Sequence, residues 1–352
     1  MTNQVRKCLG RLLHDPNNFE QELQWLTETT LLSSVYGYTP TYPSDHMVGV
    51  IENAISRVGV VAAGNFNVNI ALRLKYILAW LPGASAQQEA SVWREATDKM
   101  VNEPFDWTRS QMAAGTAAPS ILRQLLTELA AEQSEISELS EKEDILRWGI
   151  GTLYSGKALV PTVESCSHSR LINVFASRDR YVSAAKGFLL AMVLYPDIQS
   201  NAQNELDIIL GGERLPELKD RESLPYMDRV LKELFRWFSI TPLGVTHACS
   251  QDDIYRGFRI PKGAIVVSNI WAISHDSAVY PEPHVFNPDR FLDPSVPKAP
   301  AFGFGRRICP GAQFSEASLF MIASTVLTVF DVKPTSGCPM PEAKFTDIGI
   351  TA

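Results

Sequence analysis

A glycine-rich segment with a single cysteine, residues 302–311 (FGFGRRICPG), stands directly before a long apolar stretch of the chain. Proline at the first position of a helix loses nothing by lacking its N–H, so we predict a helix over residues 310 to about 330. Cys309 would then lie at a helix N-terminus. The free N–H groups and the helix dipole at that end favour a thiolate, which is the form of cysteine that binds metal ions.

The other residues of this segment suit a flat, negatively charged partner. Gly303, Gly305 and Gly311 allow tight turns and a close approach of the backbone. Arg307 presents a guanidinium group that can hold a carboxylate. The segment therefore predicts a site for a large planar metal cofactor. The alternative is a packed loop around a buried free cysteine, which is the commoner role of a lone cysteine.

The rest of the chain predicts a mainly α-helical fold. Over the first two-thirds, apolar residues recur every three or four positions, which is the pattern of amphipathic helices. From about residue 224 a helix over 227–238 is followed by short strands between 243 and 267, joined by turns with Gly and Pro. Residues 280–291 are rich in proline, which excludes regular structure. This last segment is either an ordered meander or a flexible linker.

Composition excludes several classes of protein. The 352 residues carry 32 Lys and Arg against 39 Asp and Glu, a net charge of −7 with no basic block, so we expect no nucleic-acid partner. The apolar run 319–330 is shorter than the roughly 18 residues that span a bilayer, and the start of the chain lacks the apolar segment of a secretory signal. The five cysteines are scattered without a C-x-x-C pair, which argues against a disulfide framework or a four-cysteine zinc site.

The cysteine segment resembles the haem-binding signature of the cytochrome P450 family of haem-thiolate monooxygenases, F-x-x-G-x-R-x-C-x-G. Its fixed positions are matched by Phe302, Gly305, Arg307, Cys309 and Gly311. The resemblance implies that these residues bind haem b, iron protoporphyrin IX, and that the Cys309 thiolate is the ligand of the iron.

Two further motifs follow the order of this family. Glu233 and Arg236 form an E-x-x-R pair on a predicted helix, and residues 288–291 (PDRF) resemble P-E-R-F with Asp in place of Glu. The resemblance implies that Glu233, Arg236 and Arg290 form a buried charge triad that holds the proline-rich meander behind the haem. It also places Arg307 and His247 near the haem propionates. For His247, an ordinary surface histidine is an equally good reading.

The resemblance covers residues 1–352 as a single cytochrome P450-like domain of fungal type, truncated at both ends. Residues 1–223 form its helical part, and residues 224–352 hold the E-x-x-R helix, the small sheet, the meander, the haem-binding loop and the helix after it. The N-terminal sheet and the membrane anchor of the family are expected to be missing. Family members lie in the endoplasmic reticulum membrane, and a chain without the anchor is expected to be soluble or peripheral.

The catalytic acid–threonine pair of the family is not found. It is expected just before Val182, where residues 157–181 are basic and polar and Pro161 cannot continue a helix. We predict an atypical insertion over about 157–181, and we assign no catalytic residue.

The resemblance implies a monooxygenase that inserts one oxygen atom of O2 into an apolar small molecule, in fungal secondary metabolism or xenobiotic oxidation. Electrons would come from NADPH through NADPH–cytochrome P450 reductase. Two alternatives stay open. One is a catalytically inactive truncated relative, either haem-binding or a scaffold without haem. The other is haem-thiolate isomerisation or dehydration, which needs no proton relay.

Overall fold

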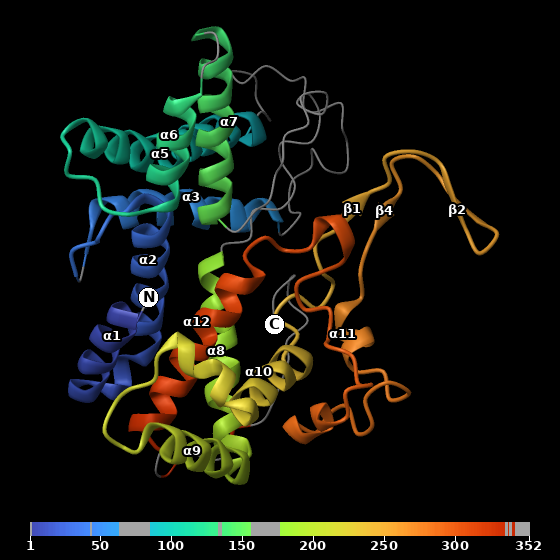
Figure 1. Ribbon diagram of the computed structural model, residues 1–352. Coiled ribbons are helices and arrows are strands. Elements are labelled where there is room, and N and C mark those ends of the chain that lie inside the picture. Colours follow the sequence, from blue (N-terminus) through green and yellow to red (C-terminus); the bar gives the residue numbers. More distant parts are fainter. Residues whose placement is uncertain are drawn as a thin grey trace. The chain divides into compact units, whose positions relative to one another are not determined.

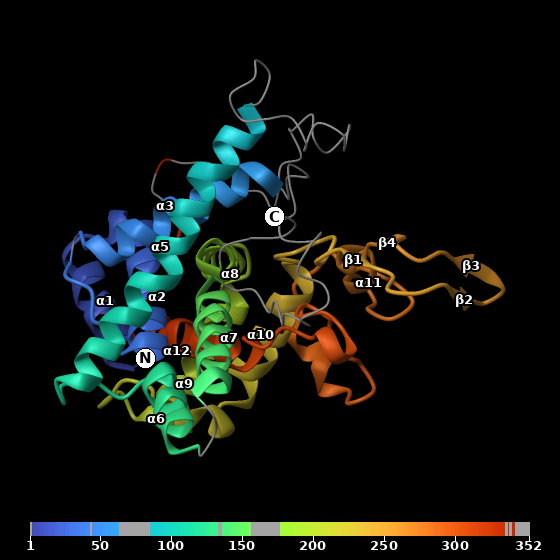
Figure 2. The same cartoon turned by 90° about the horizontal axis from the view of Figure 1, so that it is seen from above.

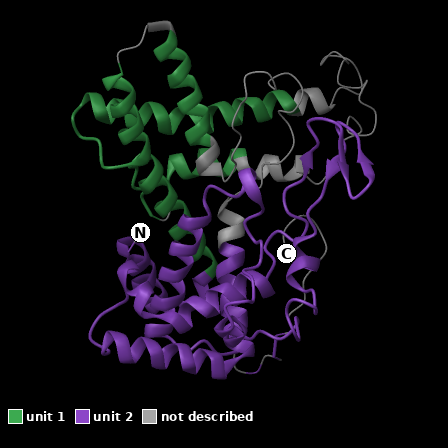
Figure 3. Ribbon diagram, turned by 45° about the vertical axis from the view of Figure 1, so that its right-hand side comes forward, with its two compact units in different colours: residues 1, 20–179 green, residues 2–19, 180–352 purple. Residues whose placement is uncertain are grey.

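The computed structural model describes residues 2–42, 44–62, 85–132, 136–155, 177–334, 337 and 340–341. They group into two compact units, residues 20–179 and residues 2–19 with 180–352 (Figure 3). The assignment of residues 1–352 to a single domain stays a prediction. Most of the predicted insertion, residues 157–176, lies outside the described residues, whereas its last five residues belong to a helix that begins at Ser177.

The regular secondary structure in the described part of the first unit is all helical. Its elements are α2 (Phe19–Tyr36), α3 (His46–Ala62), α5 (Ser85–Ala113), α6 (Ile121–Ala131) and α7 (Ile136–Ser155). Helix α5 packs against α3, α6 and α7, and buried apolar side chains such as Phe105 and Ile150 form the core between them. Pro104 lies inside α5, and the hydroxyl of Thr108 donates both to the Pro104 carbonyl and to that of Tyr36, each at 2.9 Å. This one side chain joins α5 to the end of α2.

The second unit contains the motifs predicted to carry function (Figure 1). Its helices are α1 (Thr2–His14), α8 (Ser177–Leu194), α9 (Pro196–Leu210), α10 (Pro225–Trp237), α11 (Ile270–Ser274) and α12 (Ala312–Val329), with short 3-10 segments η1 (Pro16–Asn18), η4 (Leu218–Ser223), η5 (Pro288–Leu292) and η6 (Gly305–Arg307). Helix α12 packs against α1, α9 and α10. The core of the unit therefore forms around the helix that follows the cysteine segment.

Helix α12 is also long and apolar enough to cross a membrane by length and composition, and it is the one described helix that passes this test. The sequence predicts no such helix, because its longest apolar run, residues 319–330, is shorter than the roughly 18 residues that span a bilayer. Half of helix α12 is buried inside the structure. Its contacts with α1, α9 and α10 are those of a helix in a protein core.

Two small antiparallel sheets follow α10. Strand β1 (His247–Ala248) pairs with β4 (Ile265–Val266), and β2 (Asp253–Tyr255) pairs with β3 (Phe258–Ile260). Figures 1 and 2 show the β2–β3 hairpin extending away from the helices of its unit. Both residues of its two-residue turn have positive φ, 51° at Arg256 and 84° at Gly257, as the twist of a tight hairpin requires. The predicted mainly α-helical fold with a small β-sheet region is confirmed.

Candidate functional site

The cysteine segment forms a closed loop. The Cys309 N–H donates to the carbonyl of Phe302 at 2.8 Å, so the two ends of the segment meet. Between them Gly303 and Gly305 have φ of 83° and 54°, a region that glycine enters without steric cost. Both glycines are therefore needed for the shape of this loop, as the sequence predicts.

The position of Cys309 differs from the prediction. Helix α12 begins at Ala312 with Gly311 as its N-cap residue, so Pro310 lies in a turn and the cysteine stands three residues before the first helical residue. Cys309 is a partly exposed free cysteine, and no hydrogen bond to its sulfur occurs within the described ranges. A Cβ atom on Gly311 would lie 3.8 Å from the sulfur. The glycine thus keeps one side of the sulfur free of side-chain atoms.

Two large apolar side chains of the loop are exposed to solvent, which the sequence pattern did not reveal. Phe304 is 50% exposed and Ile308 is 55% exposed, although large apolar side chains are usually buried. Between them the side chain of Arg307, the last residue of η6, is exposed and has no partner in the part of the chain that is described. The loop therefore presents apolar side chains, a free guanidinium and a partly exposed sulfur together.

The structure brings Glu233, Arg236 and Arg290 into one buried cluster. Glu233 and Arg236 are fully buried, and the side chain of Arg290 is 6% exposed. The guanidinium of Arg236 donates to both oxygens of Glu233 at 2.8 and 2.7 Å, and Nε of Arg290 donates to the same two oxygens at 3.1 Å each. The backbone N–H of Asn287 adds a fourth donor at 2.9 Å. One carboxylate therefore faces two guanidinium groups.

The excess positive charge of this cluster is met by main-chain oxygens. Arg236 donates to the carbonyls of Ser274 at 2.9 Å and Val285 at 3.3 Å. Arg290 donates to the carbonyls of Pro281 at 2.8 Å, Glu282 at 3.4 Å and Val285 at 3.1 Å. These bonds hold the proline-rich segment in one path, so it is an ordered meander and not a flexible linker.

An aromatic cluster supports the same segment from α10 and from the residue between α8 and α9. The rings of Tyr195, Trp237 and Phe286 lie 5.5 to 6.2 Å apart, and Phe286 is almost fully buried. The indole N–H of Trp237 donates to the carbonyl of His284 at 2.9 Å. Sequence reasoning missed this cluster, because its members are far apart in the chain and belong to no short motif.

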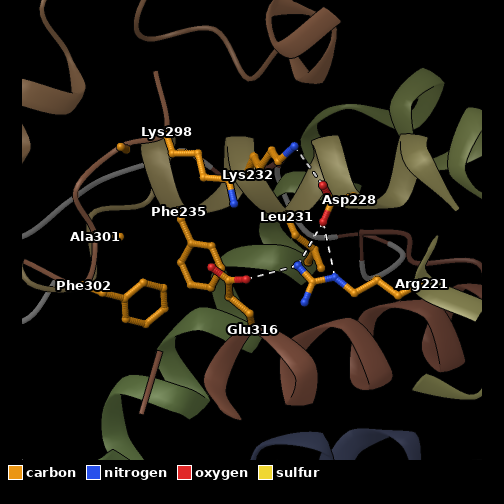
Figure 4. A pocket seen from close by; sticks show the side chains of 10 residues that line it. Arg221, Asp228, Leu231, Lys232, Phe235, Lys298, Ala301, Phe302 and Glu316 are labelled. Atoms are coloured by element: carbon orange, nitrogen blue, oxygen red, sulfur yellow. Dashed lines mark hydrogen bonds and ion pairs between the residues drawn. The ribbon is translucent and has the colours of Figure 1, made fainter. Parts of the chain in front are cut away.

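Helix α10 also contacts the cysteine loop. The ring of Phe235 packs edge-on against that of Phe302 at a centroid distance of 5.1 Å. Both rings line a small pocket of about 30 Å³ beside the loop (Figure 4). The E-x-x-R helix therefore contacts the meander with one face and the start of the cysteine loop with another.

The last predicted site residue, His247, lies on β1 opposite Val266 and is exposed. No side-chain hydrogen bond or ion pair of His247 is found among the residues that the structure describes. His275, which stands beside Asp276 in the sequence, bonds through Nδ1 to the carbonyl of Trp271 at 2.9 Å. This is a helix-end contact and not a catalytic dyad.

A family model described as Cytochrome P450 matches residues 91–351. The chain is 34% identical over 339 residues to cytochrome P450 monooxygenase 208 of Postia placenta, covering 94% of this chain and 61% of that protein. It is 32% identical over 347 residues to the O-methylsterigmatocystin oxidoreductase of Aspergillus flavus, covering 96% of this chain and 61% of that protein. The chain thus spans about three-fifths of the length of these relatives.

A solved structure supports the same fold. A zebra fish cytochrome P450 determined with progesterone superimposes with a TM-score of 0.74 at 20% sequence identity, covering 99% of this chain and 72% of that chain. At this identity the likeness shows the fold alone.

Proposed function

We propose, since this chain belongs to the cytochrome P450 family, that it is a haem-thiolate monooxygenase that inserts one oxygen atom of O2 into an apolar small molecule. The observation that carries the proposal is the partly exposed sulfur of Cys309, in a glycine-rich loop that also carries two exposed apolar side chains. Fungal secondary metabolism or xenobiotic oxidation is the proposed setting. An O-methylsterigmatocystin oxidoreductase among the relatives supports an organic small molecule as the class of substrate.

The residues of the cysteine loop fit haem b, the cofactor of this family. Cys309 offers a thiol with no disulfide partner, and Phe304 and Ile308 offer exposed apolar surface to a porphyrin. Arg307 offers a guanidinium without a partner among the described residues, which suits a propionate carboxylate. Haem b, when bound, supplies an iron centre that activates O2, and an electron-donating thiolate ligand favours cleavage of the O–O bond.

The residues of the chain have separate tasks in this proposal. Cys309 ligates the iron, and Gly311 leaves the sulfur accessible. Arg307 and His247 pair with the propionates. No residue is assigned to proton delivery, because the acid–threonine pair of the family is not found in the sequence just before Val182.

The proposed partners are those that this chemistry requires. Two electrons per turnover come from NADPH through NADPH–cytochrome P450 reductase, and O2 and the apolar substrate complete the reaction. We place the protein at the endoplasmic reticulum membrane, where fungal members of the family are typically anchored.

The test is the spectrum of the reduced protein with carbon monoxide. The purified chain, reconstituted with haem, is expected to show the strongly red-shifted Soret band of a thiolate opposite CO, and Cys309→Ala is expected to lose it. Cys249→Ala is the matched control, because Cys249 is also a partly exposed free cysteine and bonds to the Gln251 carbonyl. An unshifted band in the unsubstituted chain contradicts the proposed ligand.

Turnover distinguishes the proposed reaction from an inactive relative. With reductase, NADPH and labelled O2, a library of apolar small molecules is expected to yield products that carry one labelled oxygen atom. Products without label would favour isomerisation or dehydration. Absence of products with haem bound would favour the inactive relative.

A further inference from the structure

Five charged side chains of the second unit line a pocket beside the cysteine loop; four come from three helical elements, and the fifth, Lys298, comes from the segment before the loop (Figure 4). Arg221 comes from η4, Asp228 and Lys232 come from α10, and Glu316 comes from α12. With Phe235 and Phe302 they line the pocket of about 30 Å³, which has space for on the order of one water molecule. No motif of the sequence singles out Arg221 or Glu316.

The guanidinium of Arg221 joins two helices. It donates from Nε and Nη2 to Oδ1 of Asp228 at 3.3 and 2.9 Å, and from Nη2 to Oε2 of Glu316 at 3.2 Å. Lys232 occupies the other oxygen of Asp228 at 2.9 Å. The Arg221 side chain is 27% exposed and that of Glu316 is 29% exposed, so the bridge is partly shielded from water.

The electrostatics of Asp228 agree with a firmly held bridge. Burial alone would raise the pKa of this carboxyl, but its bonds to Lys232 and Arg221 outweigh burial and lower the pKa below its ordinary value. Asp228 therefore stays charged at neutral pH and keeps Arg221 directed toward α12.

The bridge acts close to the end of the cysteine loop. Glu316 is the fifth residue of α12, which begins three residues after Cys309. At the other end of the loop, Phe302 packs against Phe235 of α10 and accepts the backbone N–H of Cys309. Both ends of the loop are thus attached to α10: the first through an aromatic contact, the second through the Arg221 bridge.

We infer that Arg221 and Glu316 are positioning residues that fix the start of α12, and with it the sulfur of Cys309, for ligation. The inference rests on the proposed haem-thiolate function. Neither residue reaches the sulfur or a reacting atom, so neither is catalytic. Without the bridge, α12 keeps its apolar contacts, but its first turns are free to shift relative to α10. The sulfur then spends a smaller part of its time where it can bind the iron.

The test compares Glu316→Gln and Arg221→Met with Arg214→Met. Arg214 makes a two-pronged ion pair with Asp220 at 2.6 and 2.9 Å, next to Arg221, and has no ion pair with α12 among the described residues. Each variant is loaded with haem, and haem content, unfolding temperature and the ratio of red-shifted to unshifted CO bands are measured. The band ratio reports thiolate ligation and would not respond to a purely structural ion pair.

We expect Glu316→Gln and Arg221→Met to keep their haem and to lower the band ratio about threefold, which equals about 0.7 kcal/mol at 1.4 kcal/mol per factor of ten. The double variant is expected to show no more than the larger single effect, because both changes remove the same contact. Arg214→Met is expected to leave the ratio unchanged.

A band ratio in Glu316→Gln equal to that in Arg214→Met, with the red-shifted band present in the unsubstituted chain, overturns this inference and leaves the proposed function standing. Absence of the band from the unsubstituted chain overturns the proposed function itself. If Glu316→Gln does not fold, the band ratio is measured in Arg221→Lys instead. A lysine keeps the positive charge but lacks the planar guanidinium group that contacts two carboxylates. A lowered ratio there supports the inference, and an unchanged ratio overturns it.

Discussion

Replacing Glu233 by glutamine should destabilise the second unit far more than its small change in volume suggests. The substitution removes the carboxylate that accepts five hydrogen bonds, four of them from the buried guanidinium groups of Arg236 and Arg290. Removing one partner of a buried ion pair costs about 3–5 kcal/mol, because the remaining charge is left without compensation. Five donations to main-chain carbonyls remain in this case. We therefore expect the lower end of the range, about 3 kcal/mol.

The assay is urea unfolding of the haem-loaded protein, followed by circular dichroism. The matched control is Asp289→Asn, in the same motif as Arg290, where the carboxylate is 55% exposed and lies 3.4 Å from Arg229. A pair so exposed contributes about 0–1 kcal/mol, so the control should remain close to the unsubstituted protein. If the two variants lose equal free energy of unfolding, the buried charge is not what stabilises the meander, and the reasoning fails.

Gly187→Ala should lower the unfolding temperature, because a Cβ there would lie 2.8 Å from two ring carbons of Phe238; overpacking of this kind costs about 1–3 kcal/mol. Gln199→Ala should cost about 1–2 kcal/mol in urea unfolding, because the amide both accepts from Val332 N–H at 2.7 Å and donates to the Val332 carbonyl at 3.0 Å. His275→Gln should flatten the pH dependence of stability below neutral pH. Burial lowers the pKa of His275 below 6.5, so its contribution is present above pH 6.5 and is lost as the pH falls through the lowered value.

Each of these three predictions has a control or a result that would contradict it. Gly49→Ala is the control for the first, because nothing lies within 4 Å of a Cβ at that helical glycine, and equal effects of the two alanines would contradict the packing argument. For Gln199, Gln199→Glu should cost more than alanine, because it places a buried carboxylate oxygen beside the Val332 carbonyl; a Glu variant as stable as the unsubstituted protein would contradict the assigned hydrogen bonds. For His275, the urea midpoints of the unsubstituted protein and of His275→Gln are compared between pH 5 and pH 7. If the two sets change in parallel with pH, His275 is not the source of the pH dependence of stability.

The sequence predicted the fold class, the family and the three residues of the charge triad, because short motifs and local patterns carry them. The family and the fungal type are confirmed by the family model and the relatives. Residues 227–238 were predicted as a helix, and α10 covers Pro225–Trp237. Residues 310–330 were predicted as the last helix, and it begins later, at Ala312. Proline suits the first turn of a helix, but it equally suits the turn before one, and Gly311 takes the N-cap position instead.

Contacts between distant segments could not be predicted in the same way. The short strands predicted between residues 243 and 267 begin later than the first of these residues, because pairing starts at His247, where β4 offers a partner. Arg221 and Glu316 are 95 positions apart, and each also fits an ordinary exposed helix surface. Their pairing depends on how η4 and α12 pack, which no local pattern encodes. The exposed Phe304 and Ile308 could have been noticed as apolar residues inside a polar, glycine-rich loop.

The way the meander is held has a consequence for its variation. Arg236 and Arg290 bind oxygens of the main chain, which every amino acid carries, at Ser274, Pro281, Glu282 and Val285. Most side chains along this stretch can therefore be exchanged without loss of an anchoring bond. Its length cannot change, since inserting or deleting one residue would move every later oxygen out of reach of the two arginines. For protein engineering, side chains in this stretch can be replaced, whereas its number of residues should be kept.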